Sequence, residues 1–295
     1  MIGTRKTAGL VLSGCALLLW TAAGCSDGDD DPTAPSTESG RIQIEMTDAP
    51  FPYSMVESAD VTIDAVEVHH SEELEGSAWI TVDESLRALN LLDLQNGTTV
   101  LLADVPLPVG AINQIRLHVV DSSITLTDGR TFDLEIPSGD QSGIKIFPDR
   151  DIEISSDFTT RVLLDFDVSQ SFLPIPASPR QVENIQSFHF RPTIHVATLG
   201  ETGSLSGRVY STLGTMIESD DLPLPGATVL VYSDSQLVAS TASDDDGTFL
   251  VMGLAPGTYR VEITVLDFFG MNGDVTVESD ANTEIGEVRL DPILP

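Results

Sequence analysis

The residues of this chain that come nearest to a metal-ligating pattern are four histidines and one glutamate. His69, His70 and Glu72 lie within four residues of sequence, and His189 and His195 follow 117 and 123 residues after Glu72. A catalytic zinc site combines two or three neutral imidazoles with a carboxylate and leaves one position open for water. One hypothesis is therefore a zinc-dependent hydrolase that uses His69, Glu72 and His195. The alternation of apolar and polar residues around the histidines favours the other interpretation, exposed histidines on β-strands.

Two aspartates could form a catalytic pair. Asp165 and Asp167 flank Phe166, so in a β-strand their carboxylates lie on one face about 7 Å apart. Glycoside hydrolases place two carboxylates roughly 5–9 Å apart. No cluster of aromatic residues that could bind a sugar accompanies this pair, and a chain with 46 Asp and Glu is expected to carry alternating acids on its sheet surfaces. We therefore expect Asp165 and Asp167 to face solvent.

Two acidic runs, Asp244 to Asp246 and Glu218 to Asp221, are candidate calcium sites, because calcium takes six to eight oxygen ligands. Neither run has the alternating spacing of a calcium loop, and turn formation at Asp246-Gly247 accounts for the first. Asp244 and Asp246 are thus weak calcium candidates.

Other catalytic patterns do not occur in the sequence. It contains no Gly-x-Ser-x-Gly nucleophile elbow, no Cys and His pairing, no phosphate-binding Gly-Lys-Ser or Gly-Lys-Thr loop and no dinucleotide-binding fingerprint. The sequence therefore predicts no catalytic residue, no cofactor and no enzymatic activity.

The net charge argues against nucleic acid as a partner. The chain has 46 Asp and Glu against 14 Lys and Arg, a formal net charge of −32, whereas binding of a polyanion needs clustered Lys and Arg. Hydrophobic residues make up 41% of the 295 residues, which is enough for a packed core and too many for a disordered chain. The length predicts about two domains.

The first residues predict export and a membrane anchor. Arg5 and Lys6 precede an apolar stretch, residues 8–23, that is too short and too interrupted by Gly and Ser to span a bilayer. It ends in Ala22-Ala23-Gly24-Cys25, which resembles the lipobox of bacterial lipoproteins, although Ala22 stands where that family prefers Leu. The resemblance implies a signal peptide over residues 1–24 and acyl chains on Cys25 that hold the protein to a membrane.

Two alternatives to the Cys25 anchor stay open. Leu12-Ser13-Gly14-Cys15 also resembles a lipobox, and an ordinary signal peptide would leave Cys25 without a lipid. Residues 25–40 are rich in Asp, Ser, Thr and Pro and predict a disordered acidic tether. The expected location is the bacterial cell envelope, in the outer membrane or on the cell surface.

From residue 41 to residue 198 the apolar residues follow a period of two, which indicates half-buried β-strands. The phase changes once, at Ala65, and predicts a β-bulge there. The residues expected to face the core are Ile42, Ile44, Met46, Val61, Ile63, Val66 and Val68.

A hairpin is expected over Ile124 to Ile136, with a two-residue turn at Asp128-Gly129. Residues 86–94 could form a short helix. Several short strands separated by turns favour an antiparallel sandwich or barrel. The other expected strands are 115–119, 144–146, 152–154, 162–168 and 188–196.

Five segments of this region carry a family resemblance. They are MTDAP (Met46 to Pro50), LLDLQNG (Leu91 to Gly97), LPVGAINQIRL (Leu107 to Leu117), IPSG (Ile136 to Gly139) and LLDFDV (Leu163 to Val168). Together they resemble a bacterial and archaeal family known only as a domain of unknown function, DUF4382. The resemblance implies a β-rich envelope module without an established activity.

Residues 203–291 carry a different pattern. A strand with small residues (GSLSGRVY, Gly203 to Tyr210), a turn and strand (LPGATVLVY, Leu224 to Tyr232) and an expected hairpin (DDDGTFLVMGLAPGTYRVEI, Asp244 to Ile263) follow one another. This set resembles the carboxypeptidase regulatory-like domain, which implies a seven-stranded prealbumin-like sandwich. The residues expected in its core are Phe249, Val251, Tyr259, Val261, Ile263, Val275, Val277, Ile285, Val288 and Leu290.

This second resemblance bears on the zinc hypothesis. The spacing from Glu72 to His189 and His195 is like that to the third ligand in zinc carboxypeptidases, but those enzymes need a large catalytic domain of alternating helix and strand. The regulatory-like domain itself is not catalytic. Its fold relatives include carbohydrate-binding modules, which is an analogy of fold alone, and Trp79 is the one Trp outside the predicted signal peptide.

The sequence thus predicts an all-β protein with two β-sandwich domains, residues 41–198 and 203–291, after a lipoprotein signal peptide (1–24) and a disordered acidic tether (25–40). The expected function is that of a non-enzymatic cell-envelope lipoprotein that binds or scaffolds a glycan, a peptide or another envelope protein. A zinc-dependent hydrolase and a purely structural spacer are the alternatives.

Overall fold

The structure is a computed structural model that describes residues 38–49, 55–74, 77–136, 143–177, 179–212 and 222–293. Residues Thr37–Pro295 form one compact unit. The predicted signal peptide, Cys15, Cys25 and nearly all of the predicted tether lie outside the described residues. Within these ranges, no helix has the length and apolar character to cross a membrane.

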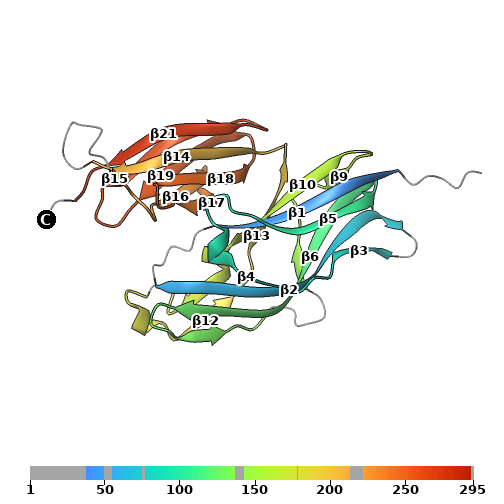
Figure 1. Ribbon diagram of the computed structural model, residues 1–295, viewed down its shortest axis with the longest axis horizontal. Coiled ribbons are helices and arrows are strands. Elements are labelled where there is room, and N and C mark those ends of the chain that lie inside the picture. The colour runs from blue at the N-terminus through green and yellow to red at the C-terminus, as the bar shows by residue number, and fades with distance from the viewer. Residues whose placement is uncertain are drawn as a thin grey trace, which may run out of the picture. The chain divides into compact units, whose positions relative to one another are not determined.

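The prediction of an all-β fold is confirmed, and strands make up most of the described chain (Figure 1). Among its described residues, the first module contains three short helical turns: η1 (Leu91–Leu94), α2 (Val168–Ser171) and η2 (Val182–Asn184). Its strands are β1 (Ser39–Ala49), β2 (Val56–Leu74), β3 (Ser77–Asp83), β4 (Arg87–Asn90), β5 (Val100–Pro108), β6 (Gly110–Leu126), β7 (Thr131–Asp133), β8 (Ile144–Ile146), β9 (Ile152–Ile154), β10 (Thr159–Asp167), β11 (Phe172–Ile175), β12 (Ser187–Phe190) and β13 (Ile194–Leu199).

Two sheets enclose the core of the first module. One has the order β13-β10-β1-β5, and the other has the order β3-β2-β6-β7, with β4 also paired to β2 and with β8 and β9 paired to β6. Strands β11 and β12 form a separate pair. The apolar faces of the two large sheets supply one continuous core. The expectation of an antiparallel module is wrong at one place, because β1 and β10 run parallel.

The predicted β-bulge lies where the sequence pattern places it. The pairing of β2 with β6 shifts in register between Ile63 and Ala65. Val61 and Ile63 before the shift and Val66 and Val68 after it are all buried. One inserted residue thus keeps both halves of a long strand facing the same core.

The prediction of a two-residue turn at Asp128-Gly129 is wrong. The turn of this hairpin has three residues, Thr127 to Gly129, because Thr125 pairs with Thr131 and the Leu126 N–H donates to the Arg130 carbonyl. Only Gly129 has a left-handed φ, +86°, whereas the predicted two-residue turn needs two such residues.

The expected strand 188–196 is two strands. β12 pairs with β11, and β13 pairs with β10 in another sheet. The break contains Pro192, which has no N–H to donate. The Thr193 N–H donates to the Ser171 hydroxyl (2.9 Å) instead of to a neighbouring strand.

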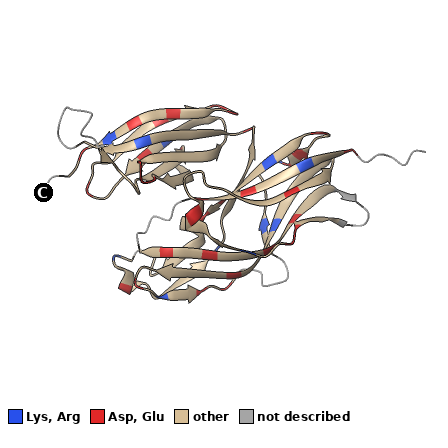
Figure 2. Cartoon of the chain, in the orientation of Figure 1, with Lys and Arg blue, Asp and Glu red and all other residues tan. Residues whose placement is uncertain are grey.

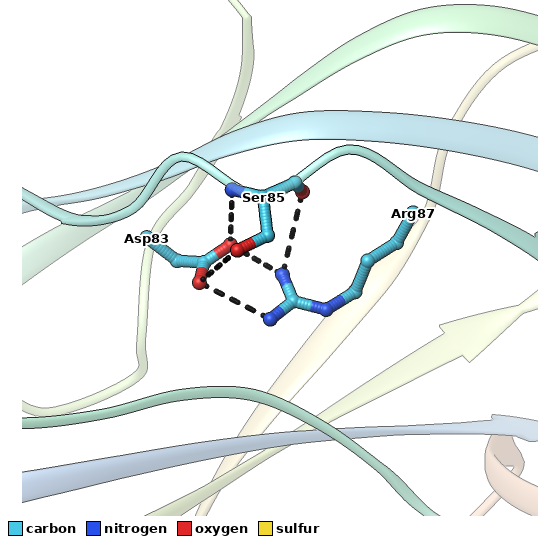
Figure 3. A network of polar contacts seen from close by, with 3 residues as sticks. All are labelled: Asp83, Ser85 and Arg87. Atoms are coloured by element: carbon cyan, nitrogen blue, oxygen red, sulfur yellow. Dashed lines mark hydrogen bonds and ion pairs between the residues drawn. The ribbon is translucent and has the colours of Figure 1, made fainter.

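The connection from β3 to β4 is held by a polar network (Figure 3). Arg87 donates to both carboxylate oxygens of Asp83, at 3.1 Å for Nη2 to Oδ1. The backbone N–H of Ser85 donates to Oδ2 of the same carboxylate at 2.9 Å. The network fixes the turn that aligns β4 beside β2.

The second module is a sandwich of two sheets. One contains β15-β14-β18 with β21 paired to β14, and the other has the order β17-β16-β19-β20. The expected core residues Phe249, Val251, Tyr259, Val261 and Ile263 are all buried. The strands are β14 (Gly203–Ser211), β15 (Leu222–Pro223), β16 (Thr228–Ser233), β17 (Gln236–Ala242), β18 (Thr248–Leu254), β19 (Gly257–Thr264), β20 (Met271–Val277) and β21 (Asn282–Leu290).

The expected hairpin over 244–263 is wrong. β18 and β19 belong to opposite sheets, and the turn before β18 also joins the two sheets, because β17 lies in the sheet of β19. Alternation along a strand indicates which side chains face the core. It does not indicate whether the next strand continues the same sheet or crosses to the other.

Asp and Glu are distributed along strands of both modules rather than gathered at one place (Figure 2). Several pair with arginines of neighbouring strands, as in Arg161 Nη2 with Glu45 Oε1 at 2.7 Å and Arg116 Nη1 with Glu67 Oε2 at 2.9 Å. The described strands thus show no basic stripe of the kind that nucleic-acid binding requires.

Candidate functional site

The histidines of the zinc hypothesis lie on different sheets. His189 on β12 and His195 on β13 are exposed, and His69 and His70 lie on β2. Among the described residues no group of three or more His, Cys, Asp or Glu is arranged to hold a metal ion. The side chain of Glu72 lies outside the described residues. The structure therefore does not bring together His69 and His195, which the hydrolase hypothesis requires.

The prediction of exposed histidines is wrong for His70, which is 0% exposed. The register of β2 against β6 shifts between His69 and His70. The ring of His70 packs against Gly110, where a Cβ would lie 2.5 Å from the ring. A residue without a side chain at position 110 thus makes room for the buried imidazole.

Trp79 lies in a contact network on the face of β2 and β3 that points away from the core. The Arg116 guanidinium stacks 3.7 Å from the centroid of its ring, and His69 meets the ring edge-on at a centroid distance of 4.8 Å. Arg116 and His118 both bind Glu67. A cation therefore covers one face of this indole, which a sugar would need open for stacking.

Asp244 binds the turn that it begins. Its Oδ1 accepts hydrogen bonds from the N–H groups of Asp246 (3.0 Å) and Thr248 (2.8 Å), and its Oδ2 accepts from the Asn96 amide (3.3 Å). Asp246 is exposed. Both oxygens of Asp244 are thus used by the protein, so this turn gives no support to a calcium site. The run Glu218 to Asp221 lies outside the described residues.

The prediction that Asp165 and Asp167 face solvent is wrong. Phe166 between them is fully buried in the first core, and on the other side of β10 Asp167 is 5% exposed and Asp165 is half-buried. Both faces of β10 are covered here because residues of β17 and β18 lie beside Asp165. Asp167 is the N-cap of α2, and its Oδ1 accepts from the Gln170 N–H at 3.0 Å.

Three of the five segments that carry the family resemblance meet at an acid cluster, which consists of the buried Asp48 and Asp167 and the half-buried Asp165. The parallel pairing of β1 with β10 sets Thr47 opposite Asp165. Oδ1 of Asp48 accepts from the Val168 N–H at 3.2 Å. The Thr47 hydroxyl donates to the Leu94 carbonyl at 2.8 Å. The segments MTDAP, LLDFDV and LLDLQNG are thereby linked around one point.

The surroundings of this cluster disfavour negative charge. Burial, followed by the charge of Asp165, raises the pKa of Asp48 well above its ordinary value, while the Val168 N–H and the Gln95 side chain oppose that rise. Burial, followed by the charge of Asp167, raises the pKa of Asp165 to about 7. A small polar space of about 10 Å³ lies beside the cluster, lined among others by Thr47, Asp48, Asp165 and Thr241.

Sequence reasoning missed Asp48, although the pattern contained a sign of it. Ile42, Ile44 and Met46 alternate toward the core, and Asp48 is the next residue on that same side of β1. A charged residue in phase with a core-facing row is costly unless something binds it. The alternation of the strand alone thus marks Asp48 as an unusual carboxylate.

Asn96 connects the first module to the edge of a sheet in the second. Its Nδ2 donates to the Thr248 carbonyl (3.2 Å), and its Oδ1 accepts from the Leu250 N–H (2.6 Å). β18 is the terminal strand of its sheet, so this amide satisfies backbone groups that a further strand would otherwise pair. At Gly97, with φ +75°, a Cβ would lie 2.5 Å from Cδ2 of Leu250.

Family profiles match nearly all of the described chain. The profile described as "Domain of unknown function (DUF4382)" matches residues 39–192, more than half of the sequence. The chain belongs to the DUF4382 family. Residues 204–291 match the profile of the carboxypeptidase regulatory-like domain, so both resemblances predicted from the motifs are confirmed. The search of curated proteins finds no match.

Several solved structures are similar to this DUF4382 protein at low sequence identity. A cohesin–X-dockerin complex of Acetivibrio cellulolyticus is 22% identical over 30% of this chain and 56% of that chain, with a TM-score of 0.24. The minor pilin GBS52 of Streptococcus agalactiae is 10% identical over 86% of this chain and 97% of that chain, with a TM-score of 0.27. A DUF3823 family protein of Parabacteroides merdae is 23% identical over 32% and 46%, with a TM-score of 0.22. The chain spans about half the length of the first and the third. Likenesses of this degree do not indicate a function.

Proposed function

We propose that the chain is a non-enzymatic lipoprotein of the bacterial cell envelope, in which two β-sandwich modules act as one binding or scaffolding unit that acylated Cys25 holds to a membrane. The observation that carries this proposal is the direct link between the modules. The Asn96 amide hydrogen-bonds the edge strand β18 at two backbone positions. A linked pair of modules presents a fixed surface, as a scaffold requires.

Two observations support this function over the alternatives. The exposed His189 and His195 lie on different strands from His69, which gives the hydrolase hypothesis no common site in the described residues. The Trp79 ring is stacked by Arg116, which favours a protein or peptide partner over a sugar that stacks on tryptophan. A purely structural spacer could contain the same contacts, so binding to a partner has to be tested directly.

The anchor is tested by metabolic labelling with a radioactive fatty acid in a bacterial host. We expect the wild-type chain to carry label and to partition into the membrane fraction, and Cys25→Ser to lose both. Cys15→Ser is the matched control and keeps both, because the proposed cleavage removes Cys15. Label that persists in Cys25→Ser, or that disappears in Cys15→Ser, contradicts the proposal.

The scaffolding role is tested by crosslinking on intact cells. A photoreactive residue replacing an exposed side chain, such as Leu266 (86% exposed), should join the wild-type chain to one envelope partner. The same replacement in Cys25→Ser should give no such product, because the chain is then released. Absence of any partner at several exposed positions would favour a spacer.

A further inference from the structure

Strand β13 is an edge of its sheet, because it pairs with β10 and with no other strand of the described chain. The Asp167 N–H donates to the Thr193 carbonyl (3.0 Å), one step beyond the pair of Phe166 with Ile194. In an antiparallel pair, residues bonded in this way alternate with residues whose N–H and C=O groups point away from the partner strand. Ile194 and Val196 therefore each direct an N–H and a C=O away from β10.

These backbone groups of Ile194 and Val196 have no hydrogen-bond partner on that side among the described residues. The next residue in the same phase, Thr198, uses its carbonyl in the turn that follows. This carbonyl accepts from the Glu201 N–H (3.2 Å) and from the Thr202 hydroxyl (3.3 Å). A row of unpaired N–H and C=O groups at a sheet edge is a template for pairing with another chain.

A groove lies beside this edge of β13. Val196, Ala197 and Thr198 line a space of about 750 Å³, which is within the usual range of ligand sites. Its other walls include the turn at residues 148–150, between β8 and β9, and the turn at residues 255–256, between β18 and β19. Three strand residues extend over about 10 Å, so the groove has room for a few residues lying along β13.

The groove fits a free extended segment better than a folded domain. The edge strand of a folded sandwich brings a second sheet about 10 Å behind it, and turns from both modules border the groove. A single extended segment needs only the space of one strand. Its own backbone supplies the alternating donors and acceptors that the edge of β13 lacks, as in other cases of β-strand addition.

Charge and side-chain size restrict the kind of segment that fits. The charged residues of the lining are Asp149, Glu201 and Arg150, and the whole chain has a net charge of −32. Acidic segments are therefore repelled. The uncharged lining is mostly small and includes Ala197, Gly200, Gly253 and Ala255. Because such residues offer little to hold a large side chain, affinity has to come from main-chain hydrogen bonds.

We propose that β13 binds an extended segment of a partner protein, free of acidic residues, as an added strand that hydrogen-bonds Ile194 and Val196. This inference rests on the proposed binding function and names the kind of partner. It does not require the Cys25 anchor, so the anchor and the groove are tested separately.

The test uses short linear peptides, selected from a random phage-displayed library on the full-length chain in detergent and measured by fluorescence anisotropy. We expect the selected peptides to lack Asp and Glu. N-methylation of alternate backbone amides in one phase should weaken binding about tenfold or more, because it removes the N–H groups that face β13. N-methylation in the other phase should leave binding unchanged. Equal effects of the two phases would show that binding does not use an added strand.

Two variants of the chain locate the binding. Ala255→Trp fills the groove from an exposed position, and Val196→Pro removes an N–H on the side where edge strands tolerate proline. Each should weaken peptide binding about tenfold or more. Ala88→Trp is the matched control, because Ala88 is exposed on β4 and does not line the groove, and it should bind like wild type.

Circular dichroism checks that each variant is folded, and Ala255→Trp decides the question if Val196→Pro is not. The proposal is overturned if the library gives no binding peptide, or if the peptides bind Ala255→Trp as they bind wild type. A partner crosslinked on intact cells in the absence of such peptides would support the proposed function and exclude this groove as its site.

Discussion

At the scale of single residues, the distinctive feature of this protein is two carboxylates held where negative charge is disfavoured. Asp48 lies on the core-facing side of β1, and Asp165 lies on a face of β10 that residues of the second module cover. Each has a raised pKa, with burial as the main cause. In the folded protein these surroundings favour the protonated form of each carboxyl.

This predicts an unusual pH dependence of the protein's stability. Asp165 has a pKa of about 7 in the folded chain and an ordinary pKa near 3.8 when the chain is unfolded. Between these values the folded state holds a proton that the unfolded state has lost, so stability is present below the lower value and is lost as the pH rises through about 7. We expect the urea concentration at the unfolding midpoint to fall from pH 5 to pH 8.

Asp165→Asn should flatten that fall, because an amide does not titrate. A variant at an exposed acid, Asp246→Asn, is the control and should retain the wild-type slope. Equal slopes in all three proteins would mean that Asp165 titrates normally in the folded state.

The burial of single residues on β1 and β10 was predictable from the sequence only in part. The alternation of β1 identifies Ile42, Ile44 and Met46 as core residues, and the structure confirms all three. The same alternation around Phe166 places Asp165 and Asp167 opposite the core, but it cannot tell whether that outer face meets solvent or a second module. The prediction of solvent-facing aspartates is wrong because the covering strands, β17 and β18, lie far along the sequence.

At the scale of elements, strand phase is predictable and strand partnership is not. The bulge at Ala65 follows from a single phase change in the sequence. The parallel pairing of β1 with β10, and the crossing of the chain between sheets from β18 to β19, have no local signature because each depends on distant segments. The local sequence thus determines which side chains of a strand face the core, whereas pairing between distant segments determines which sheet the strand joins.

One prediction belongs to the β3–β4 connection. Partial burial acts to raise the pKa of Asp83, but hydrogen bonds from Arg87 and Ser85 outweigh it and hold that pKa below its ordinary value. The paired charges are both largely shielded from solvent, at 25% and 15% side-chain exposure. Arg87→Ala should lower the free energy of unfolding at pH 7 by about 1 kcal/mol, the upper end of the range for such pairs.

The sign of the pH effect here is opposite to that at Asp165. A lowered pKa adds stability above the unfolded pKa and loses it as the pH falls through the folded one. The difference between wild type and Arg87→Ala in urea unfolding should therefore shrink from pH 7 to pH 3. Arg87→Lys, which keeps the charge without the two-pronged geometry, should recover only part of the loss. A constant difference across pH would show that packing, rather than the ion pair, stabilises this turn.

At the scale of the whole molecule, the two sandwiches have separate cores, and both apolar and polar groups join them. Gly97 packs against Leu250, and Gly253 packs against Ala197. Asn96 adds hydrogen bonds to the edge strand β18, and its backbone is left-handed, with φ +56°. The same turn follows η1, so the position of Asn96 depends on the packing of Leu91 and Leu94 in the first core.

This gives a prediction about rigidity. Asn96→Gly keeps the left-handed backbone accessible but removes the hydrogen bonds to Thr248 and Leu250, at a cost of about 2 kcal/mol for the pair. We expect the variant to flex between its modules, so that small-angle X-ray scattering gives a larger radius of gyration and protease cuts the connection at residues 198–202 faster than in wild type. Asn282→Ala is the matched control, because Asn282 hydrogen-bonds Ser204 and Ser206 within the second module only. If Asn96→Gly has the radius of gyration and the cleavage rate of the wild type, other contacts hold the modules together. That result would contradict the proposal that the Asn96 hydrogen bonds make the two modules one scaffolding unit.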